Sequence, residues 1–306
     1  MHTHGFVDPR LLTTERGVRA LKWSLGGLLA TALLQVVIVW LSGSVALLAD
    51  TIHNFADAAT AIPLWIAFRL ADRQPTRRFP YGYGRVEDLA GVAIVGTILF
   101  SAGVAGYQSA DRLLHPRSVE YLWAVAAASV IGFAGNEGVA LFRIKVGKEI
   151  GSAALVADGY HARVDGWISL AVLFGALGVW LGFPLADPLV GLLITCAILW
   201  IVWESGRAVF TRMLDGVEPE LIEEICAAAR DVQGVCDVTD VRARWVGHWL
   251  RAEVNIAVES SLPVAEGHRI AKRTHQRLLD KLPHLSAVTV HVDPVEESGE
   301  QHHNHS

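Results

Sequence analysis

The sequence is short of charge. Only 19% of its 306 residues are Asp, Glu, Lys or Arg, whereas 52% are hydrophobic and the mean hydropathy is +0.36. Soluble globular domains carry about 25% charged residues, so this composition excludes an ordinary soluble enzyme. Such apolar surface needs more than a protein core to cover it. A lipid bilayer, which a helix crosses with about 20 mostly apolar residues, provides that cover.

Several other signals are missing as well. The three cysteines (Cys196, Cys226 and Cys236) have no C-x-x-C spacing, so we interpret them as reduced thiols that pack as small hydrophobic groups. The metalloprotease pattern H-E-x-x-H is absent. The first apolar stretch lacks a small-residue cleavage site, which favours a retained span over a signal peptide. We expect neither an enzyme nor an organic cofactor.

Long apolar runs fill the first two thirds of the chain and predict a membrane domain over residues 20–209. We expect an all-α bundle of six transmembrane helices. Their predicted ranges are 20–40, 45–70, 89–109, 121–142, 153–181 and 188–209.

The distribution of Lys and Arg predicts the orientation, because basic residues in short loops stay in the cytosol. Two predicted loops are basic. The loop after the second span holds Arg73, Arg77, Arg78 and Arg85, and the loop after the fourth holds Arg143, Lys145 and Lys148. The loop after the third span, with Arg112 and Arg117, gives a weaker contrast. Both termini are therefore predicted in the cytosol of a multi-pass protein of the plasma (inner) membrane.

After residue 209 the composition becomes that of a soluble domain, predicted over residues 210–295. From Thr211 onward there are sixteen acidic and ten basic residues, a balance that argues against nucleic acid. Periodicity predicts helices at 218–230 and 263–282 and strands at 235–246, 249–258 and 287–292. This order indicates a cytosolic α+β domain of ferredoxin-like type. We expect a cytosolic N-terminal tail at 1–19 and a C-terminal tail at 296–306. Their ends, residues 1–4 and 302–306, are rich in histidine, and weak metal binding and metal delivery both remain open.

A motif that occurs twice in the chain contains the candidate metal-binding residues. Residues 49–57 read ADTIHNFAD and residues 157–165 read ADGYHARVD, so both fit A-D-x-x-H-x-x-x-D. On a helix that advances about 100° per residue, these polar groups share one face. The members are Asp50, His53 and Asp57 in the second span, and Asp158, His161 and Asp165 in the fifth.

Acidic groups inside a membrane need a partner. Insertion scales assign a cost of about 2.5–3.5 kcal/mol to an Asp at the centre of a span. A divalent cation between two such stripes relieves the repulsion, and two imidazoles with two carboxylates form a tetrahedral set that zinc accepts. We therefore predict His53, Asp57, His161 and Asp165 as ligands. A hydrogen bond between His and Asp would explain a single copy of the motif equally well. For Asp50 and Asp158, ligand support, proton transfer and helix packing remain open.

These residues resemble the cation diffusion facilitator family. The resemblance lies in the run GSVALLADTIH at 43–53, the paired H-x-x-x-D motifs, Asp187-Pro188 and the sequence HVDP at 291–294. It implies a homodimeric antiporter that carries a divalent metal out of the cytosol in exchange for protons by alternating access. Histidine at the first position of both motifs implies the zinc-type branch. Export of Fe²⁺, Co²⁺, Ni²⁺, Cd²⁺ or Mn²⁺, a passive metal channel and a metal-sensing membrane scaffold are the alternatives.

The resemblance also bears on two further metal sites. The family commonly has a histidine in the loop after the second span, where this chain has Tyr83, so we expect no interfacial site there. In the soluble domain the resemblance implies a metal site from His268, His291 and Asp293, with His248 and Asp240 as further candidates. His291 and Asp293 alternate along a predicted strand and therefore share a face. Solvated surface histidines are the alternative.

Overall fold

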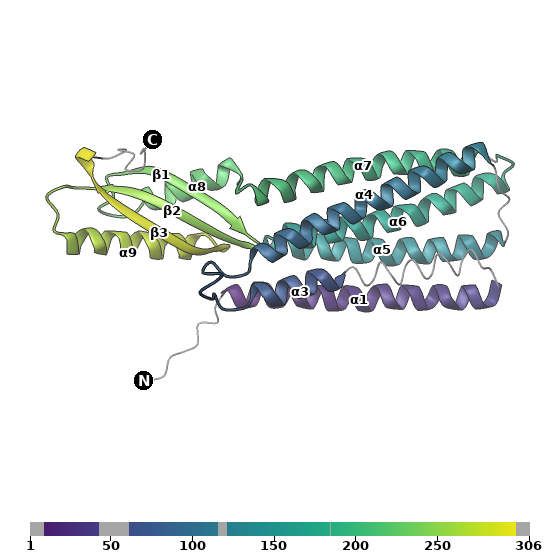
Figure 1. Cartoon of the computed structure of the whole chain (residues 1–306), viewed down its shortest axis with the longest axis horizontal. Helices are drawn as coiled ribbons and strands as arrows, with labels where there is room; N and C mark the ends of the chain where they lie inside the picture. The colour runs from purple at the N-terminus through teal and green to yellow at the C-terminus, as the bar shows by residue number, and fades with distance from the viewer. Residues whose placement is uncertain (1–8, 43–60, 116–120, 184, 298–306) are drawn as a thin grey trace, which may run out of the picture. The chain divides into compact units, whose positions relative to one another are not determined.

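The computed structural model describes residues 9–42, 61–115, 121–183 and 185–297. The chain divides into two compact units, which meet in sequence between Phe210 and Thr211. The first unit is helical. The second is a small α/β domain, as predicted (Figure 1).

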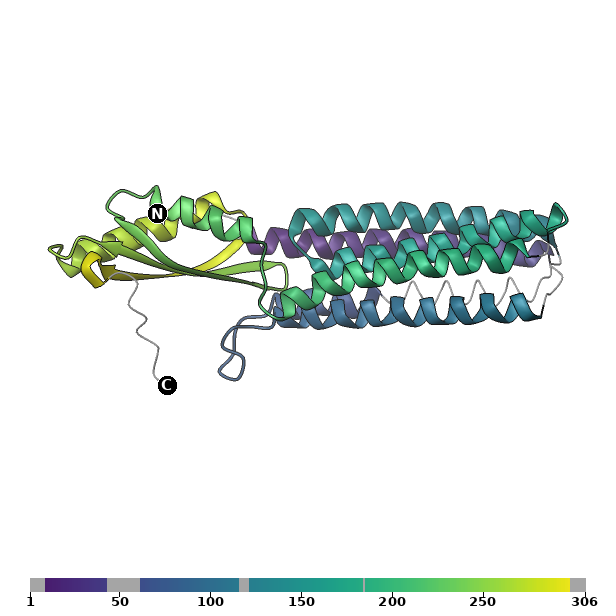
Figure 2. The ribbon, with the colours of Figure 1, turned by 90° about the horizontal axis from the view of Figure 1, so that it is seen from above.

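The helical unit contains six helices among the described residues. They are α1 (Pro9–Ser42), α3 (Ala61–Ala71), α4 (Arg85–Leu114), α5 (Leu122–Ile150), α6 (Ala153–Trp180) and α7 (Ala186–Met213). All except α3 are long and apolar enough to cross a membrane. The second predicted span, 45–70, is described only from Ala61, where α3 covers its last part. Figures 1 and 2 show the helices lying alongside one another.

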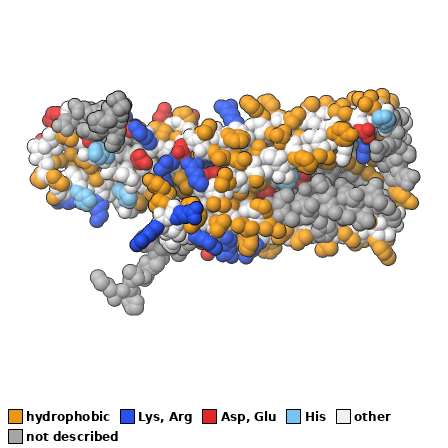
Figure 3. Space-filling view, viewed as in Figure 1, with side chains coloured by type: hydrophobic (Ala, Val, Ile, Leu, Met, Phe, Trp, Pro, Cys, Tyr) orange, Lys and Arg blue, Asp and Glu red, His pale blue; other side chains and the backbone are white. Residues whose placement is uncertain are grey.

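Burial in this unit is the reverse of that in a soluble protein. Ala, Leu, Ile and Val residues and one phenylalanine form the core, including Leu64, Phe68, Ile98 and Leu155, each 0% exposed. Large apolar side chains cover the outside, among them Phe100 and Leu193, at 73% and 71% exposed. Figure 3 shows hydrophobic side chains spread over the helical region. Such an exterior suits hydrocarbon rather than water.

In three of the predicted loops, basic residues assigned to the loop belong to a helix instead. Arg143, Lys145 and Lys148, predicted in a loop after the fourth span, lie inside α5, and Arg143 is buried. Arg112 and Arg85 likewise belong to α4. The reason is physical, because hydropathy marks the part of a helix that lies in hydrocarbon, whereas the backbone hydrogen bonds continue into the polar region.

The second unit folds as predicted from its periodicity. Its elements are α8 (Pro219–Arg230), β1 (Asp237–Val246), β2 (Trp249–Val258), α9 (Val264–Lys281), β3 (Leu285–Pro294) and the 3₁₀ turn η1 (Val295–Glu297). The sheet order is β1-β2-β3, with β1 antiparallel and β3 parallel to β2. A two-residue loop, Gly247 and His248, joins β1 to β2, and Gly247 supplies the positive φ that such a hairpin needs.

Alternation along β2 separates a buried face from an open one. Leu250, Ala252, Val254 and Ile256 are buried against α8 and α9, which contribute Ile225, Ile270 and Leu278 to the same core. The intervening residues, including Glu253 and Asn255, lie on the opposite face. One face of the sheet is therefore left for polar side chains.

Candidate metal centre

The start of α6 is fixed by a compact turn. Gly151, at φ +74°, ends α5, and Ser152 caps α6 by accepting a hydrogen bond from the backbone N–H of Leu155 at 3.1 Å. The Ser152 hydroxyl also donates to Glu87 of α4 at 2.5 Å, and both side chains are buried. This anchoring sets the rotation of α6 and hence the direction of its polar stripe.

The predicted stripe of α6 is buried throughout. Asp158, His161 and Asp165 are 0%, 2% and 8% exposed. Their spacing of three and four residues places them on one side of the helix, facing the interior of the bundle. Ionisable side chains in a membrane-spanning helix are functional candidates, because inserting them into the bilayer costs free energy.

His161 and Asp165 form the candidate metal half-site. The His161 Nε2 and Asp165 Oδ2 atoms are 3.9 Å apart, which is too long for a hydrogen bond. Neither ring nitrogen of His161 has a hydrogen-bond partner in the part of the chain that the structure describes. Buried polar atoms are normally paired, so an imidazole left without partners beside a carboxylate is suited to a cation.

Asp158, the third member, faces a different partner. Its Oδ2 lies 3.0 Å from Nη1 of Arg143 on α5, and the two side chains are 0% and 1% exposed. Sequence reasoning missed this pair because it assigned Arg143 to a loop. A signal was present, since Arg143 and Asp158 lie at similar distances before and after the tight turn at Gly151, where a helical hairpin brings them face to face.

A second ion pair joins the same two helices. Arg163 of α6 contacts Glu137 of α5 through Nε, 3.2 Å from each carboxylate oxygen, and through Nη2 at 2.8 Å. These side chains are 22% and 24% exposed. The pair is bidentate, the arrangement in which Arg and carboxylate are most strongly oriented.

The first motif, with Asp50, His53 and Asp57, lies outside the described residues. Within the described ranges, no three His, Cys, Asp or Glu side chains come together in a way that could hold a metal ion. The four-ligand set therefore stays a prediction, of which the structure describes the half on α6.

In the α/β domain, two of the predicted cytosolic residues come together. His291 Nε2 and Asp293 Oδ1 are 2.8 Å apart on β3, and β-pairing sets Asn255 beside His291. Asp240 pairs with Asn255 across the sheet, and its carboxylate contacts Arg242 at 3.0 Å. His268 is exposed on α9, in the helical layer.

His248 lies elsewhere. It is in the β1–β2 turn, seven residues before Asn255, roughly 20 Å along the strand direction. There it is buried against the ring of Trp249 at 4.9 Å between centroids. Its neighbour is His284: burial lowers the pKa of His284, and the charges of Arg212 and His248 lower that pKa further.

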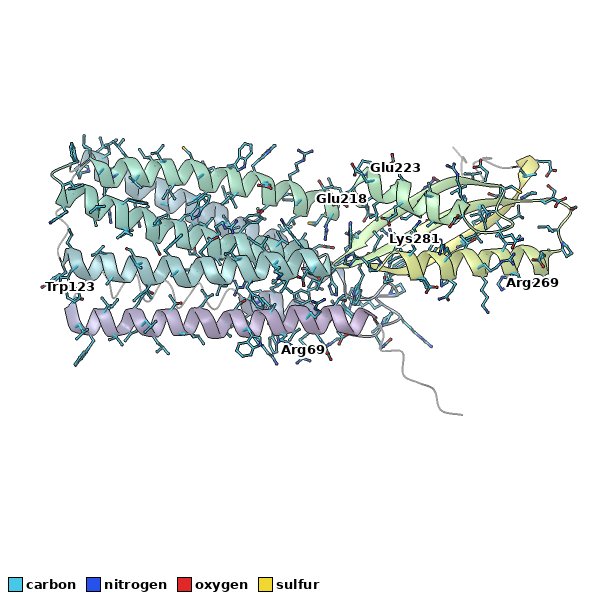
Figure 4. The ribbon with its side chains drawn as sticks, turned by 180° about the vertical axis from the view of Figure 1, so that it is seen from behind. Arg69, Trp123, Glu218, Glu223, Arg269 and Lys281 are labelled. Carbon is cyan, nitrogen blue, oxygen red and sulfur yellow. The ribbon has the colours of Figure 1, made fainter. Side chains whose placement is uncertain are left out.

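The loop between α3 and α4 is basic and exposed at its tip. Arg73, Arg77 and Arg78 are exposed, and Tyr83 packs on Phe79 at 4.9 Å between ring centroids. Arg85 contacts Asp88 at 3.3 Å. Figure 4 shows Arg69, just before this loop, at the opposite end of the bundle from Trp123.

Comparison with known proteins agrees with this anatomy. Residues 21–214 match the family described as "Cation efflux transmembrane domain", and residues 217–295 match "Cation efflux protein, cytoplasmic domain". A "Probable cation efflux system protein" of Mycobacterium tuberculosis is 53% identical over 95% of this chain and 87% of its own length.

A more distant relative is similar to most of the chain, and a solved structure is similar to a quarter of it. The magnetosome protein MamB of Magnetospirillum gryphiswaldense is 27% identical over 89% of this chain and 92% of its own. A solved structure of the MamM CTD covers 25% of this chain and 98% of its own, at 28% identity and a TM-score of 0.25.

The two family matches follow one another and together cover the helical bundle and the α/β domain. The transmembrane match makes the protein an integral, multi-pass membrane protein. The second match is to the cytoplasmic domain through which these transporters dimerise. The chain therefore belongs to the cation efflux, or cation diffusion facilitator, family, whose members are transporters of divalent metals rather than enzymes.

Proposed function

We propose that this protein exports Zn²⁺ from the cytosol in exchange for protons. The transport site is formed by His161 and Asp165 of α6 with His53 and Asp57 of the second predicted span. One observation carries the proposal: the His161 imidazole is 2% exposed and its nitrogens have no hydrogen-bond partner among the described residues, beside a buried carboxylate. That arrangement is costly unless a cation binds there.

The donor set favours zinc. Imidazole nitrogen is a good ligand for Zn²⁺, and two imidazoles with two carboxylates satisfy its tetrahedral preference. Ions that prefer all-oxygen sites, such as Mn²⁺, gain less from two nitrogens. Fe²⁺, Co²⁺, Ni²⁺ and Cd²⁺ also accept this set and are the competing substrates.

Proton coupling follows from the same ligands. Imidazole binds a metal only in its neutral form, and histidine is the side chain that titrates nearest to neutrality. Protons and metal therefore compete for one site. A site that opens alternately to each side would load metal from the cytosol and release it where the proton concentration is higher.

The remaining features extend the proposal to the whole transporter. We infer both termini in the cytosol, a location in the plasma (inner) membrane and a homodimer held by the α/β domains. A cytosolic metal site would use His291 and Asp293, which already contact one another, together with the exposed His268. His248 and Asp240 are less suited to it, because His248 is at the far end of β2 and Asp240 contacts Arg242.

The test is Zn²⁺ uptake by proteoliposomes under an imposed pH gradient. His161→Ala and Asp165→Asn should each lower uptake by more than about tenfold, since even groups that only support metal ligands are worth roughly 10–100-fold. His115→Ala is a matched control. His115 lies 3.3 Å from Asp111 at the same four-residue spacing, but in an exposed pair.

Loss of uptake in the two α6 variants, with folding retained and His115→Ala unchanged, supports the proposal. Normal uptake by His161→Ala would contradict the metal site. If uptake is lost in the α6 variants but does not depend on the pH gradient, the protein is a passive channel instead.

A further inference from the structure

The polar stripe of α6 carries one acidic group more than a four-ligand site uses. Asp158, His161 and Asp165 are all buried on the same side of α6. A free carboxylate at Asp158 would lie one helical turn from the imidazole, where it could add a third oxygen donor. The structure instead directs this carboxylate to Arg143.

The Arg143–Asp158 pair is closed to solvent on both sides. The Nη1–Oδ2 distance is 3.0 Å, at 1% and 0% exposure. The Nε and Nη2 atoms of Arg143 and both carboxylate oxygens of Asp158 have no hydrogen-bond partner among the residues described, so the two side chains are held together by charge. Asp158 is thus the main counter-ion of a guanidinium that stays charged in proteins. Removing either member leaves an uncompensated charge inside the bundle.

Close helix packing keeps the pair in place. A Cβ atom on Gly159 would come within 2.9 Å of the backbone nitrogen of Ile144 and 3.1 Å of Cβ of Arg143. A Cβ atom on Gly147 would come within 2.9 Å of the backbone nitrogen of Val156. Because the backbones of α5 and α6 touch beside Asp158, its short side chain cannot turn toward His161 without losing Arg143.

The register of the two helices is held on the other side of His161 as well. Arg163 and Glu137 form the bidentate pair, with the basic residue now on α6 and the acidic residue on α5. The two pairs have opposite polarity, so sliding one helix along the other would bring like charges together. His161 therefore lies on a segment whose position against α5 is fixed at both ends.

We propose that Arg143 is a positioning residue that determines metal specificity by holding Asp158 away from the transported ion. With Asp158 bound, α6 offers the ion one imidazole and one carboxylate. Released, Asp158 would supply an additional hard oxygen donor with a negative charge, which favours Mn²⁺ over Zn²⁺. The inference rests on the proposed transport site and adds the group that limits its ligand set.

The experiment compares kcat/KM for Zn²⁺ and for Mn²⁺ uptake in proteoliposomes containing the full chain. Arg143→Met should lower the Zn²⁺/Mn²⁺ ratio by about tenfold or more, in the range known for groups that support metal ligands. The double variant Arg143→Met/Asp158→Asn has no carboxylate to release and should restore the ratio. Asp158→Asn alone should lower thermal stability but leave the ratio unchanged. Arg143→Lys should shift the ratio in the same direction by less.

A purely structural role makes different predictions. It would lower uptake of both metals together and leave their ratio unmoved in every variant, which would overturn the proposal. A double variant as poor in Zn²⁺ uptake as Arg143→Met would also overturn it, because the loss would then come from the missing arginine and not from a released carboxylate. If Arg143→Met does not fold, Arg143→Lys and Asp158→Asn decide: the ratio must move in the first and not in the second. Normal Zn²⁺ uptake by His161→Ala would instead show that the transport site itself is wrong.

Discussion

At the scale of single residues, burial distinguishes three histidine–aspartate pairs. His115 and Asp111 are exposed at the end of α4, His291 and Asp293 are partly exposed on β3, and His161 and Asp165 are buried in α6. The exposed imidazoles can bind water. His161 cannot, and its 3.9 Å separation from Asp165 is the longest of the three. Only this pair lacks an explanation without a ligand.

His284 gives the α/β domain a predictable response to acid. Burial, then Arg212 and then His248 lower its pKa from the ordinary 6.5, and the ring lies 5.9 Å from that of Trp245. The unfolded chain therefore binds a proton near pH 6.5, whereas the folded domain does so only at lower pH. The stabilising contribution is complete above about pH 6.5 and is lost as the pH falls below it toward the folded pKa.

Thermal unfolding of the full chain in detergent, measured between about pH 7.5 and 5, tests this. The unaltered domain should lose stability on acidification, and His284→Gln should flatten that dependence. His268→Gln, at an exposed position on α9, is the control and should keep the slope. An unchanged slope in His284→Gln would assign the pH dependence to other groups.

At the scale of elements, what could be predicted from sequence depends on how local the determining pattern is. The elements of the α/β domain begin and end close to their predicted bounds, because strand alternation and helical amphipathicity are properties of short windows. Alternation also correctly put His291 and Asp293 within reach of each other. His248 was grouped with them on residue type alone, and type carries no information on distance along a sheet.

The membrane helices are the contrasting case. Their apolar centres were recognisable, but α1, α4 and α5 extend well beyond the predicted ranges. Pairing between helices was not predictable from any one window. Arg143 meets Asp158, and Arg163 meets Glu137, only because the turn at Gly151 and Ser152 folds α5 back against α6.

The contact between α5 and α6 yields a prediction about this pair of elements. Gly159→Ala should lower the free energy of unfolding by about 1–3 kcal/mol, the usual range for overpacking, since the new methyl group would meet the backbone of Ile144. Gly138→Ala, on α5, is the matched control, because no atom lies within 4 Å of the added Cβ. It should be neutral or slightly stabilising.

Thermal unfolding in detergent compares the two. If Gly159→Ala and Gly138→Ala change the free energy of unfolding equally, α5 and α6 separate easily. Helix packing would then not hold Asp158 in place.

At the scale of the whole molecule, the hydrophobic clusters of the helical bundle and the hydrophobic core of the α/β domain serve different environments. The bundle turns large apolar residues outward, whereas α8 and α9 carry charged residues on their outer faces, such as Glu223 and Arg269 (Figure 4). The bundle thus requires a bilayer and the α/β domain requires water.

The side of the membrane on which this domain lies is the last prediction. Exposed Arg73, Arg77 and Arg78 between α3 and α4 indicate that this loop stays in the cytosol. One predicted span, the second, separates that loop from the end of α1. We therefore expect the loop and the end of α1 on opposite sides of the membrane. Four further predicted spans return the chain to the cytosol before the α/β domain begins. This orientation does not depend on Arg85, Arg112 or Arg143, which lie within helices.

Exposed Cys236 in the α/β domain reports on this arrangement. In a chain with Cys196→Ala and Cys226→Ala, a membrane-impermeant maleimide should label Cys236 in inside-out vesicles and not in intact cells. Ser42→Cys, placed at the end of α1 in a chain that also carries Cys236→Ala, should show the reverse. Labelling of Cys236 from outside would mean that the α/β domain faces the exterior. The transporter would then have the opposite orientation, and the proposed export would be uptake. Labelling of both positions from one side would mean that the second predicted span, of which α3 is the described part, does not cross the membrane.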